Sequence, residues 1–308
     1  MRRRDRQHGV AVLIAMLALA IGTIIAVNLA WQDTLAVRRF ESALAMDQGM
    51  LYVQGAEAWA ADILHQDIVD SPQSDNLGEI WATDLPPLPV DGGTIQGKLE
   101  DLQGRFNLNN LINDRGLPDP VALKQFERLL SLLEIDPTLA GGVLDWLDPD
   151  TEVRFPNGGE DTTYAAADPP YRAANTEITT PSELMAVTGF DRKTYAKLAP
   201  YVTTLPRGTK LNVNTAADVV IASLSDMIDL STAKALVDER GDKEFVDIKG
   251  TFEGLVDRDT LKRIDGVSEH FLLTATVTLG TNQMTMRSVL QRDRSGLTRA
   301  LFRNLGIE

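Results

Sequence analysis

The chain has 308 residues, of which 44% are hydrophobic and 24% charged, enough to bury a sizeable core and form about two compact units. Its 44 acidic and 30 basic residues give a formal net charge of −14, which opposes binding to nucleic-acid phosphates and favours cationic partners or metal ions. The chain contains no cysteine, so disulfides, thiolate metal sites and cysteine nucleophiles are excluded.

The N-terminus predicts a membrane anchor. An uncharged, mostly apolar stretch over residues 10–32 follows a short basic segment that contains Arg2, Arg3, Arg4 and Arg6. About 20 apolar residues span the hydrocarbon layer of a bilayer, and flanking arginines mark the cytoplasmic side. We therefore expect a single-pass helix with the rest of the chain outside the cytoplasm. A cleavable secretory signal is disfavoured because it has a shorter apolar core and an A-x-A-like site; an ordinary signal anchor stays open on these residues alone.

The remaining pattern predicts an α+β protein. Apolar residues continue at helical spacing as far as Trp59, and the first proline is Pro72, so we expect one long helix that becomes amphipathic beyond the membrane. Two β-hairpins are predicted, one over 94–111 around Gln103-Gly104 and one over 271–290. The segment between them reads as helices with loops, which suggests a long helix packed on a small antiparallel sheet and interrupted by a large all-α insertion.

A basic leader that ends in glycine before such a helix resembles the type IV pilin and pseudopilin family, whose leader is cut after that glycine. The matching bond is Gly9–Val10, and Ile14 stands at the fifth mature position, where the family usually has glutamate. The K-type branch lacks this glutamate. The phrases at 102–111, 144–150 and 211–216 also resemble that branch, so the chain is identified as a member of the K-type minor pseudopilins of type II secretion systems.

The resemblance implies a domain organisation and a function. It divides the chain into a prepilin leader (1–9), the transmembrane half of the helix (10–32), the first part of a pilin-like domain (33–111), the helical insertion (112–266) and final strands with a tail (267–308). It implies cleavage by prepilin peptidase, methylation, an inner-membrane location with a periplasmic C-terminal domain, and I- and J-type pseudopilins as partners. The bulky insertion would collide with neighbours inside a filament, which favours a position at the pseudopilus tip.

An acidic stretch after Trp146 predicts a metal site. Seven carboxylates stand between residues 145 and 168 against the single base Arg154, with no histidine or cysteine near them. A divalent cation would offset their repulsion, and oxygen ligands in a flexible loop favour calcium. The resemblance also implies calcium, because K-type pseudopilins bind calcium in their helical insertion. We expect Asp148, Asp150, Glu160, Asp161 and Asp168 to bind the ion, with Asp145 and Glu152 as further candidates. The alternative is an acidic surface that only contacts solvent.

Two other function classes have weaker support in the sequence. Residues 182–201 and 212–236 have the rhythm of helix-hairpin-helix units, which in some proteins bind nucleic-acid phosphates. The second hairpin, 225–231, contains two aspartates and no glycine, so we interpret these units as a packing scaffold and expect no nucleic-acid binding. An enzyme is disfavoured because no nucleophile elbow, phosphate loop or histidine-centred group accompanies the acids.

Overall fold

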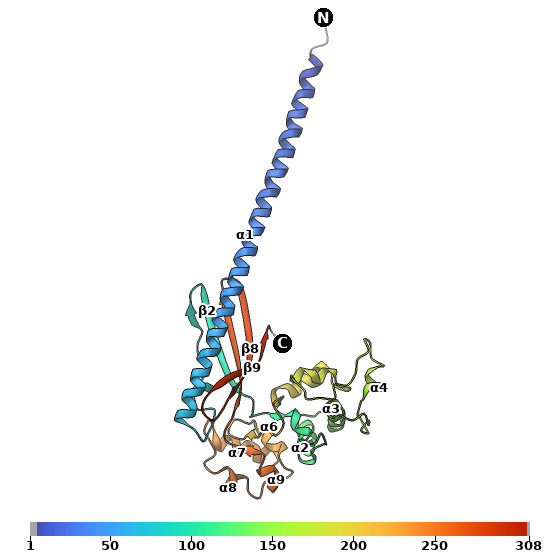
Figure 1. The fold of residues 1–308 in the computed structure, drawn as a ribbon, viewed down its shortest axis with the longest axis vertical. Helices are drawn as coiled ribbons and strands as arrows, with labels where there is room; N and C mark the ends of the chain where they lie inside the picture. The colour runs from blue at the N-terminus through green and yellow to red at the C-terminus, as the bar shows by residue number, and fades with distance from the viewer. Residues whose placement is uncertain (1–4, 307–308) are drawn as a thin grey trace.

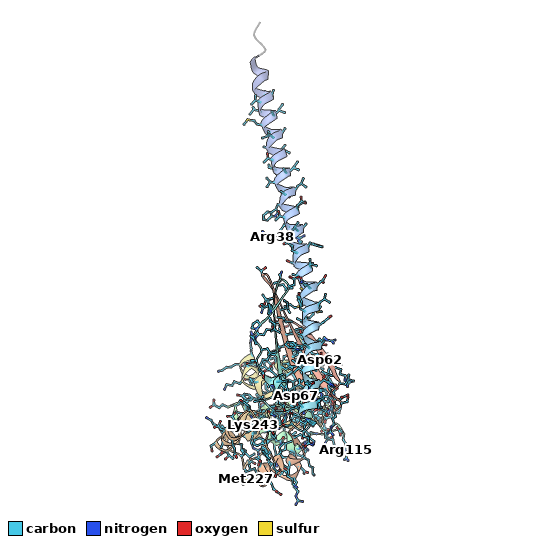
Figure 2. All side chains as sticks on the ribbon, turned by 90° about the vertical axis from the view of Figure 1, so that its left-hand side faces the viewer. Arg38, Asp62, Asp67, Arg115, Met227 and Lys243 are labelled. Carbon is cyan, nitrogen blue, oxygen red and sulfur yellow. The ribbon has the colours of Figure 1, made fainter. Side chains whose placement is uncertain are left out.

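A computed structural model describes residues 5–306, so Arg2, Arg3 and Arg4 of the expected leader lie outside the described residues. One helix, α1 (Asp5–Asp70), has 66 residues and is roughly 100 Å long at 1.5 Å per residue. Its N-terminal half projects away from the globular part, and Arg38 still lies clear of it (Figures 1 and 2). The long helix predicted from the apolar spacing is confirmed, and it ends two residues before Pro72, where a helix cannot continue.

The C-terminal half of α1 packs on a five-stranded antiparallel sheet with the order β1-β2-β7-β8-β9. The strands are β1 (Leu88–Val90), β2 (Gly93–Asp101), β7 (His270–Leu279), β8 (Asn282–Arg292) and β9 (Thr298–Leu305). The predicted hairpin over 271–290 is confirmed as β7 and β8, whose pairing places Ala275 opposite Met286. The α+β class is therefore confirmed, with a long helix on one face of the sheet (Figure 1).

A compact apolar core joins α1 to the sheet. Every second residue of β7 is buried, as expected for a strand with one covered face. On α1 the buried positions are three or four residues apart, which is the spacing of one helix face. The core includes Val53, Ala56, Ala60 and Leu64 from α1, Phe271, Leu273, Ala275 and Val277 from β7, and Trp81 from the short helix η1 (Ile80–Ala82).

The predicted hairpin over 94–111 is wrong. Strand β2 pairs along its length with β7, which is far away in sequence. After it, the short strand β3 (Phe106–Asn107) runs parallel to β4 (Val202–Thr203). Gln103 and Gly104 make long-range contacts and no hairpin turn. The Gln103 amide donates to the carbonyl oxygen of Lys210 (3.1 Å), and a Cβ on Gly104 would lie 2.6 Å from Thr215 Oγ1.

The chain between β2 and β7 folds into two small helical lobes, each with its own apolar core and each closed by a short parallel pair of strands. The first core runs from Phe106 to Val202, so the helical part begins before residue 112. Its elements are η2 (Leu108–Leu111), α2 (Pro120–Leu132), η3 (Pro137–Leu139), α3 (Ala140–Leu147), α4 (Asp161–Tyr164), η4 (Pro181–Ala186), α5 (Arg192–Leu198) and η5 (Ala199–Tyr201).

The second lobe has a core that runs from Val213 to Ile264. It is closed by β5 (Leu211–Asn212) and β6 (Ile264–Asp265), which pair in parallel. Between them lie α6 (Asp218–Ser223), α7 (Leu230–Arg240), α8 (Ile248–Phe252) and α9 (Arg258–Leu261). Both lobes lie at the end of α1 opposite the N-terminus (Figure 1).

Buried asparagines fasten the first lobe internally and join the second lobe to the sheet. Asn109 donates to the carbonyl oxygens of Ile178 and Leu205, both at 3.0 Å. Asn212 donates to Asp101 Oδ2 (3.0 Å) and to the carbonyl oxygen of Asp75 (3.0 Å). A buried amide must satisfy its donors and acceptor to avoid a desolvation cost. These bonds give a structural reason for the asparagine-rich phrases at 102–111 and 211–216.

Candidate metal centre

The acidic loop begins where α3 ends. Asp148 is the C-terminal cap residue of α3 and has an extended backbone (φ −81°, ψ 158°), because Pro149 follows it and disfavours helical backbone at the preceding residue. The loop then returns to α3, where the backbone N–H of Arg154 donates to Asp145 Oδ2 (2.9 Å). Gly158 is required at the closest approach, since a Cβ there would overlap the Asp145 carboxylate and the Arg154 carbonyl oxygen.

This return brings three carboxylates together. One oxygen each of Asp148, Asp150 and Glu160 lie within 4.8 Å of one another. Asp148 and Glu160 are buried, at 0% and 2% exposure, whereas the Asp150 side chain is 46% exposed and leaves the group open to solvent on one side. The carboxylate oxygens of Glu160 have no hydrogen-bond partner among the described residues, and the Asp148 carboxylate has only its ion pair with Arg154. Unsatisfied buried carboxylates are costly, so this group has the chemistry of a site for a hard cation.

One internal cation contacts the group. Arg154 Nη1 lies 2.8 Å from Asp145 Oδ1 and also contacts the Asp148 carboxylate, and Arg154 Nη2 lies 3.6 Å from Asp150 Oδ2. Three carboxylates therefore share one guanidinium, and Glu160 lies beside them without an ion pair to it. The four ionised carboxylates and the guanidinium together carry a formal charge of −3. A calcium ion would bring this sum close to neutrality.

The electrostatics favour protons on this group when no cation is bound. Burial, together with Asp145, Asp148 and Asp150, raises the pKa of Glu160 to about 7. Burial also raises the pKa of Asp148, although Arg154 opposes the shift. Both shifts have the cause expected when carboxylates are withdrawn from water beside like charges. A divalent cation would therefore displace protons and compete with them below neutral pH.

The structure brings together three of the five predicted ligands. Asp161 and Asp168 are not part of the group: Asp161 accepts from the backbone N–H of Ala173 (3.1 Å), and Asp168 is exposed. Asn175 was not among the predicted residues; its Nδ2 donates to the Asp150 carbonyl oxygen (3.2 Å). Its Oδ1 is buried without a hydrogen-bond partner among the described residues. Amide oxygens are good calcium ligands, but a lone asparagine 15 residues beyond Glu160 gives no signal in the sequence.

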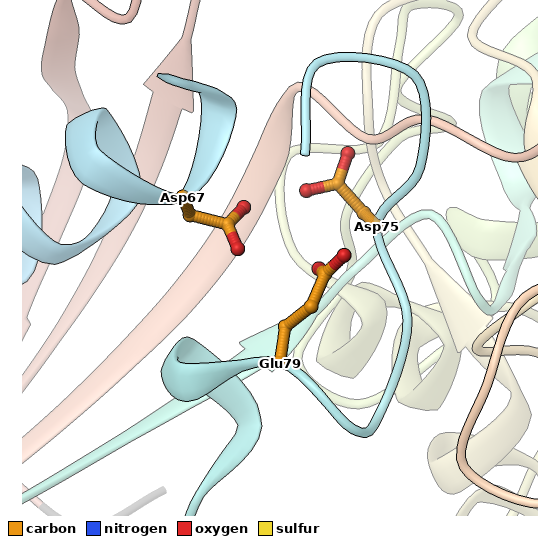
Figure 3. A group of neighbouring side chains, drawn as sticks. All are labelled: Asp67, Asp75 and Glu79. Atoms are coloured by element: carbon orange, nitrogen blue, oxygen red, sulfur yellow. The ribbon is translucent and has the colours of Figure 1, made fainter. Parts of the chain in front are cut away.

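A second carboxylate group lies at the junction of α1 and the sheet. Asp67, Asp75 and Glu79 point toward one another from the end of α1 and the loop that follows it (Figure 3). Arg292 fills this group, donating to Asp67 Oδ2 (2.7 Å) and to Asp75. Glu79 accepts from Trp81 Nε1 (2.8 Å). Because its carboxylates have donors, this group is a structural ion pair and the weaker candidate for a metal.

The helix pairs of the lobes carry their own anions. Asp191 caps α5, accepting from Thr194 N (2.7 Å), and Asp229 caps α7, accepting from Thr232 N (2.7 Å). Asp247 and Asp257 cap α8 and α9 in the same way. A phosphate bound at these N-termini would meet a carboxylate that already takes the free N–H groups. The caps support the interpretation of these pairs as packing units.

Comparisons with known proteins assign the chain to a family. Family models for "Type II secretion system (T2SS), protein K" match residues 104–207 and 211–271, ranges that cover the two lobes. Type II secretion system protein K of Pseudomonas aeruginosa is 34% identical over 98% of this chain and 94% of its own length. The Aeromonas hydrophila protein is 33% identical over 94% of both.

A solved structure is also similar. It is a chain from the crystal structure of the GspK-GspI-GspJ complex of the enterotoxigenic Escherichia coli type 2 secretion system. The match has a TM-score of 0.78 and 27% identity, and it covers 88% of this chain and 100% of that one. The fold is therefore shared over the whole of that chain.

Proposed function

The chain belongs to the type II secretion system protein K family and is a minor pseudopilin; from this premise we propose that it is a structural subunit, not an enzyme, that caps the pseudopilus and supports protein export across the outer membrane. It would be cut by prepilin peptidase at Gly9–Val10 and methylated. It would reside as a single-pass protein of the inner membrane, with residues beyond 33 in the periplasm.

The observation that carries this proposal is the exposed apolar surface of α1. The stretch that begins at Val10 is long and apolar enough to cross a membrane, and none of it is covered by the globular part. Beyond it, Phe40, Leu44 and Leu51 are 71%, 57% and 69% exposed. Their spacing of four and seven residues places them on one face of the helix. This exposed apolar face, interrupted by Asp47, follows a stretch that fits a bilayer, so α1 offers surface to lipid first and to partner helices next.

The position at the tip is supported by the two lobes. They lie at the end of α1 opposite the N-terminus (Figure 1) and extend well beyond the sheet, so a subunit stacked above them would meet their bulk. Ile14, in place of a carboxylate, is consistent with a subunit that has no neighbour above it whose terminal amine needs pairing. The partners we propose are other minor pseudopilins of the I and J types, as in the similar solved complex.

We also propose that the loop after α3 binds calcium. Asp148, Asp150 and Glu160 would supply the first ligands, and the unpartnered Oδ1 of Asn175 a further oxygen. Calcium accepts six to eight oxygen ligands in irregular geometry, which suits a loop, whereas magnesium demands a regular octahedron. The cation would supply positive charge that holds the loop against α3, and it would have a structural role.

The assembly proposal is tested with residues 33–308 mixed with candidate minor pseudopilins, and a stable complex is expected on size exclusion. Leu51→Lys, on the exposed apolar face, should weaken the complex at least about tenfold, because a charge replaces a buried contact. Leu117→Lys is the matched control, since Leu117 is 56% exposed but lies on the first lobe. Failure of the unaltered protein to form any complex, or equal loss with both variants, would count against this assembly surface.

A further inference from the structure

Arg154 occupies the position from which a cation would act on the carboxylates. Its Nη1 contacts Asp145 and Asp148, its Nη2 lies 3.6 Å from Asp150, and its side chain is only 27% exposed. The deeper oxygens, those of Glu160, have no donor among the described residues. The guanidinium thus neutralises the group from one side only and leaves a buried carboxylate uncompensated.

Calcium and this guanidinium would compete for the same oxygens. A calcium ion lies 2.3 to 2.6 Å from its oxygen ligands, so an ion bound by Asp148 and Asp150 would stand within roughly 5 Å of a guanidinium that still contacts both. Two cations at that distance repel each other strongly where the environment is partly buried. Asp145 differs from the other two carboxylates, because it also accepts the backbone N–H of Arg154 (2.9 Å).

We propose that Arg154 is an internal counter-ion that calcium displaces from Asp148 and Asp150, while the pair with Asp145 is kept. The inference rests on the calcium site proposed above. In the calcium-free protein Arg154 limits the repulsion among the carboxylates and keeps the loop closed. The cost of its displacement lowers the affinity for calcium. It also couples metal binding to the neighbouring tip of the loop, where the Phe155 side chain is 97% exposed.

The sign of one mutational effect separates this role from simple structural support. Removing a competing cation strengthens calcium binding, whereas removing a support that shapes the site weakens it. We therefore expect Arg154→Gln to lower the Kd for calcium at least about tenfold, within the range usual for coupled binding events. Arg154→Lys, which keeps the positive charge but loses the guanidinium fork, should lower the Kd less than Arg154→Gln does.

The measurement is calorimetric titration of the full-length protein in detergent, after chelator treatment, with calcium chloride. Arg172→Gln is the matched control: it removes the same charge from the segment just beyond α4, but Arg172 is 85% exposed and its Nε lies 3.9 Å from Asp161 Oδ2, outside the group. Its Kd should change less than about twofold, because exposed charges are screened. If Arg154→Gln unfolds in chelator, calcium release from the loaded protein into a fluorescent chelator replaces the titration, and slower release than from the unaltered protein is expected.

The outcomes are distinct. If the unaltered protein and Arg154→Gln both bind no calcium, the metal site itself is refuted, whereas the assembly function is untouched. If the unaltered protein binds calcium and Arg154→Gln binds it equally or more weakly, or releases it equally fast or faster, the counter-ion role is refuted. An equal gain in Arg172→Gln would also overturn it, since the effect would then be one of net charge.

Discussion

Arg292 provides the sharpest test of how the long helix is attached to the sheet. Its side chain is 1% exposed, and it donates to Asp67 Oδ2 (2.7 Å), to Asp75 and to the carbonyl oxygens of Leu64 and Ser268 (both 3.0 Å). Arg292→Met keeps the apolar stem and removes the charge. Breaking a buried ion pair by removing one partner costs about 3 to 5 kcal/mol, because the other charge stays buried and uncompensated.

The cost should depend on pH. Burial is the main cause that raises the pKa of Asp67 to about 6, and Arg292 opposes that shift. Without Arg292 this carboxyl should take up a proton at a still higher pH. At pH 5 it is then neutral in the folded variant, so less buried charge is left unpaired. We expect the loss of unfolding free energy to be about 3 to 5 kcal/mol at pH 7.5 and clearly smaller at pH 5.

The assay is urea unfolding of residues 33–308, followed by tryptophan fluorescence, since Trp81 lies in the same core. Arg303→Met is the matched control. Arg303 also joins the sheet to α1, through Glu57 (2.7 and 2.8 Å), but is 56% exposed, so its loss should be at most about 1 kcal/mol. A loss below about 1 kcal/mol for Arg292→Met at pH 7.5, or an equal loss at both pH values, would refute the reasoning.

Three further predictions concern the metal loop and the core. Calcium at a hundredfold excess over its Kd should stabilise the fold by about 2.7 kcal/mol. Thermal unfolding should show this gain, Asp148→Asn should abolish it, the exposed Asp168→Asn should retain it, and magnesium should replace calcium poorly. Gly158→Ala should lower the melting temperature and the calcium response together, because its Cβ overlaps the Asp145 carboxylate; an unchanged melting curve would contradict this close approach. Burial lowers the pKa of His270 from 6.5 to about 4, so the unfolded chain binds a proton that the folded one cannot, and stability should fall by up to about 3 kcal/mol as pH drops from 6.5 to 4. His270→Gln should remove this part of the pH dependence in chemical unfolding, and equal pH profiles for both proteins would argue against a buried neutral imidazole.

Local patterns in the sequence were enough for the elements whose structure depends on their own residues. The apolar spacing up to Trp59 and the position of Pro72 predicted α1, because a helix satisfies its backbone hydrogen bonds within itself. The alternation in residues 271–279 and the turn after Leu279 predicted β7 and β8, because two strands joined by a tight turn form their backbone hydrogen bonds with each other.

Contacts between distant segments were beyond such patterns. The prediction of a hairpin at 94–111 is wrong because the residue pattern of β2 does not determine which strand pairs with it. Its partner is β7, which both lobes separate from β2 in the sequence. A two-residue strand such as β3 has no detectable periodicity, and its partner β4 lies beyond most of the first lobe.

The metal loop shows the same division. The crowding of carboxylates after Trp146 predicted, from the sequence alone, a loop that would favour a hard cation. Only the tertiary structure decided that Asp148, Asp150 and Glu160 converge, that Asp161 and Asp168 do not, and that Arg154 contacts the group. The physical reason is that charge follows from composition, whereas the few ångströms that separate a ligand from a solvated carboxylate depend on how the loop folds back on α3.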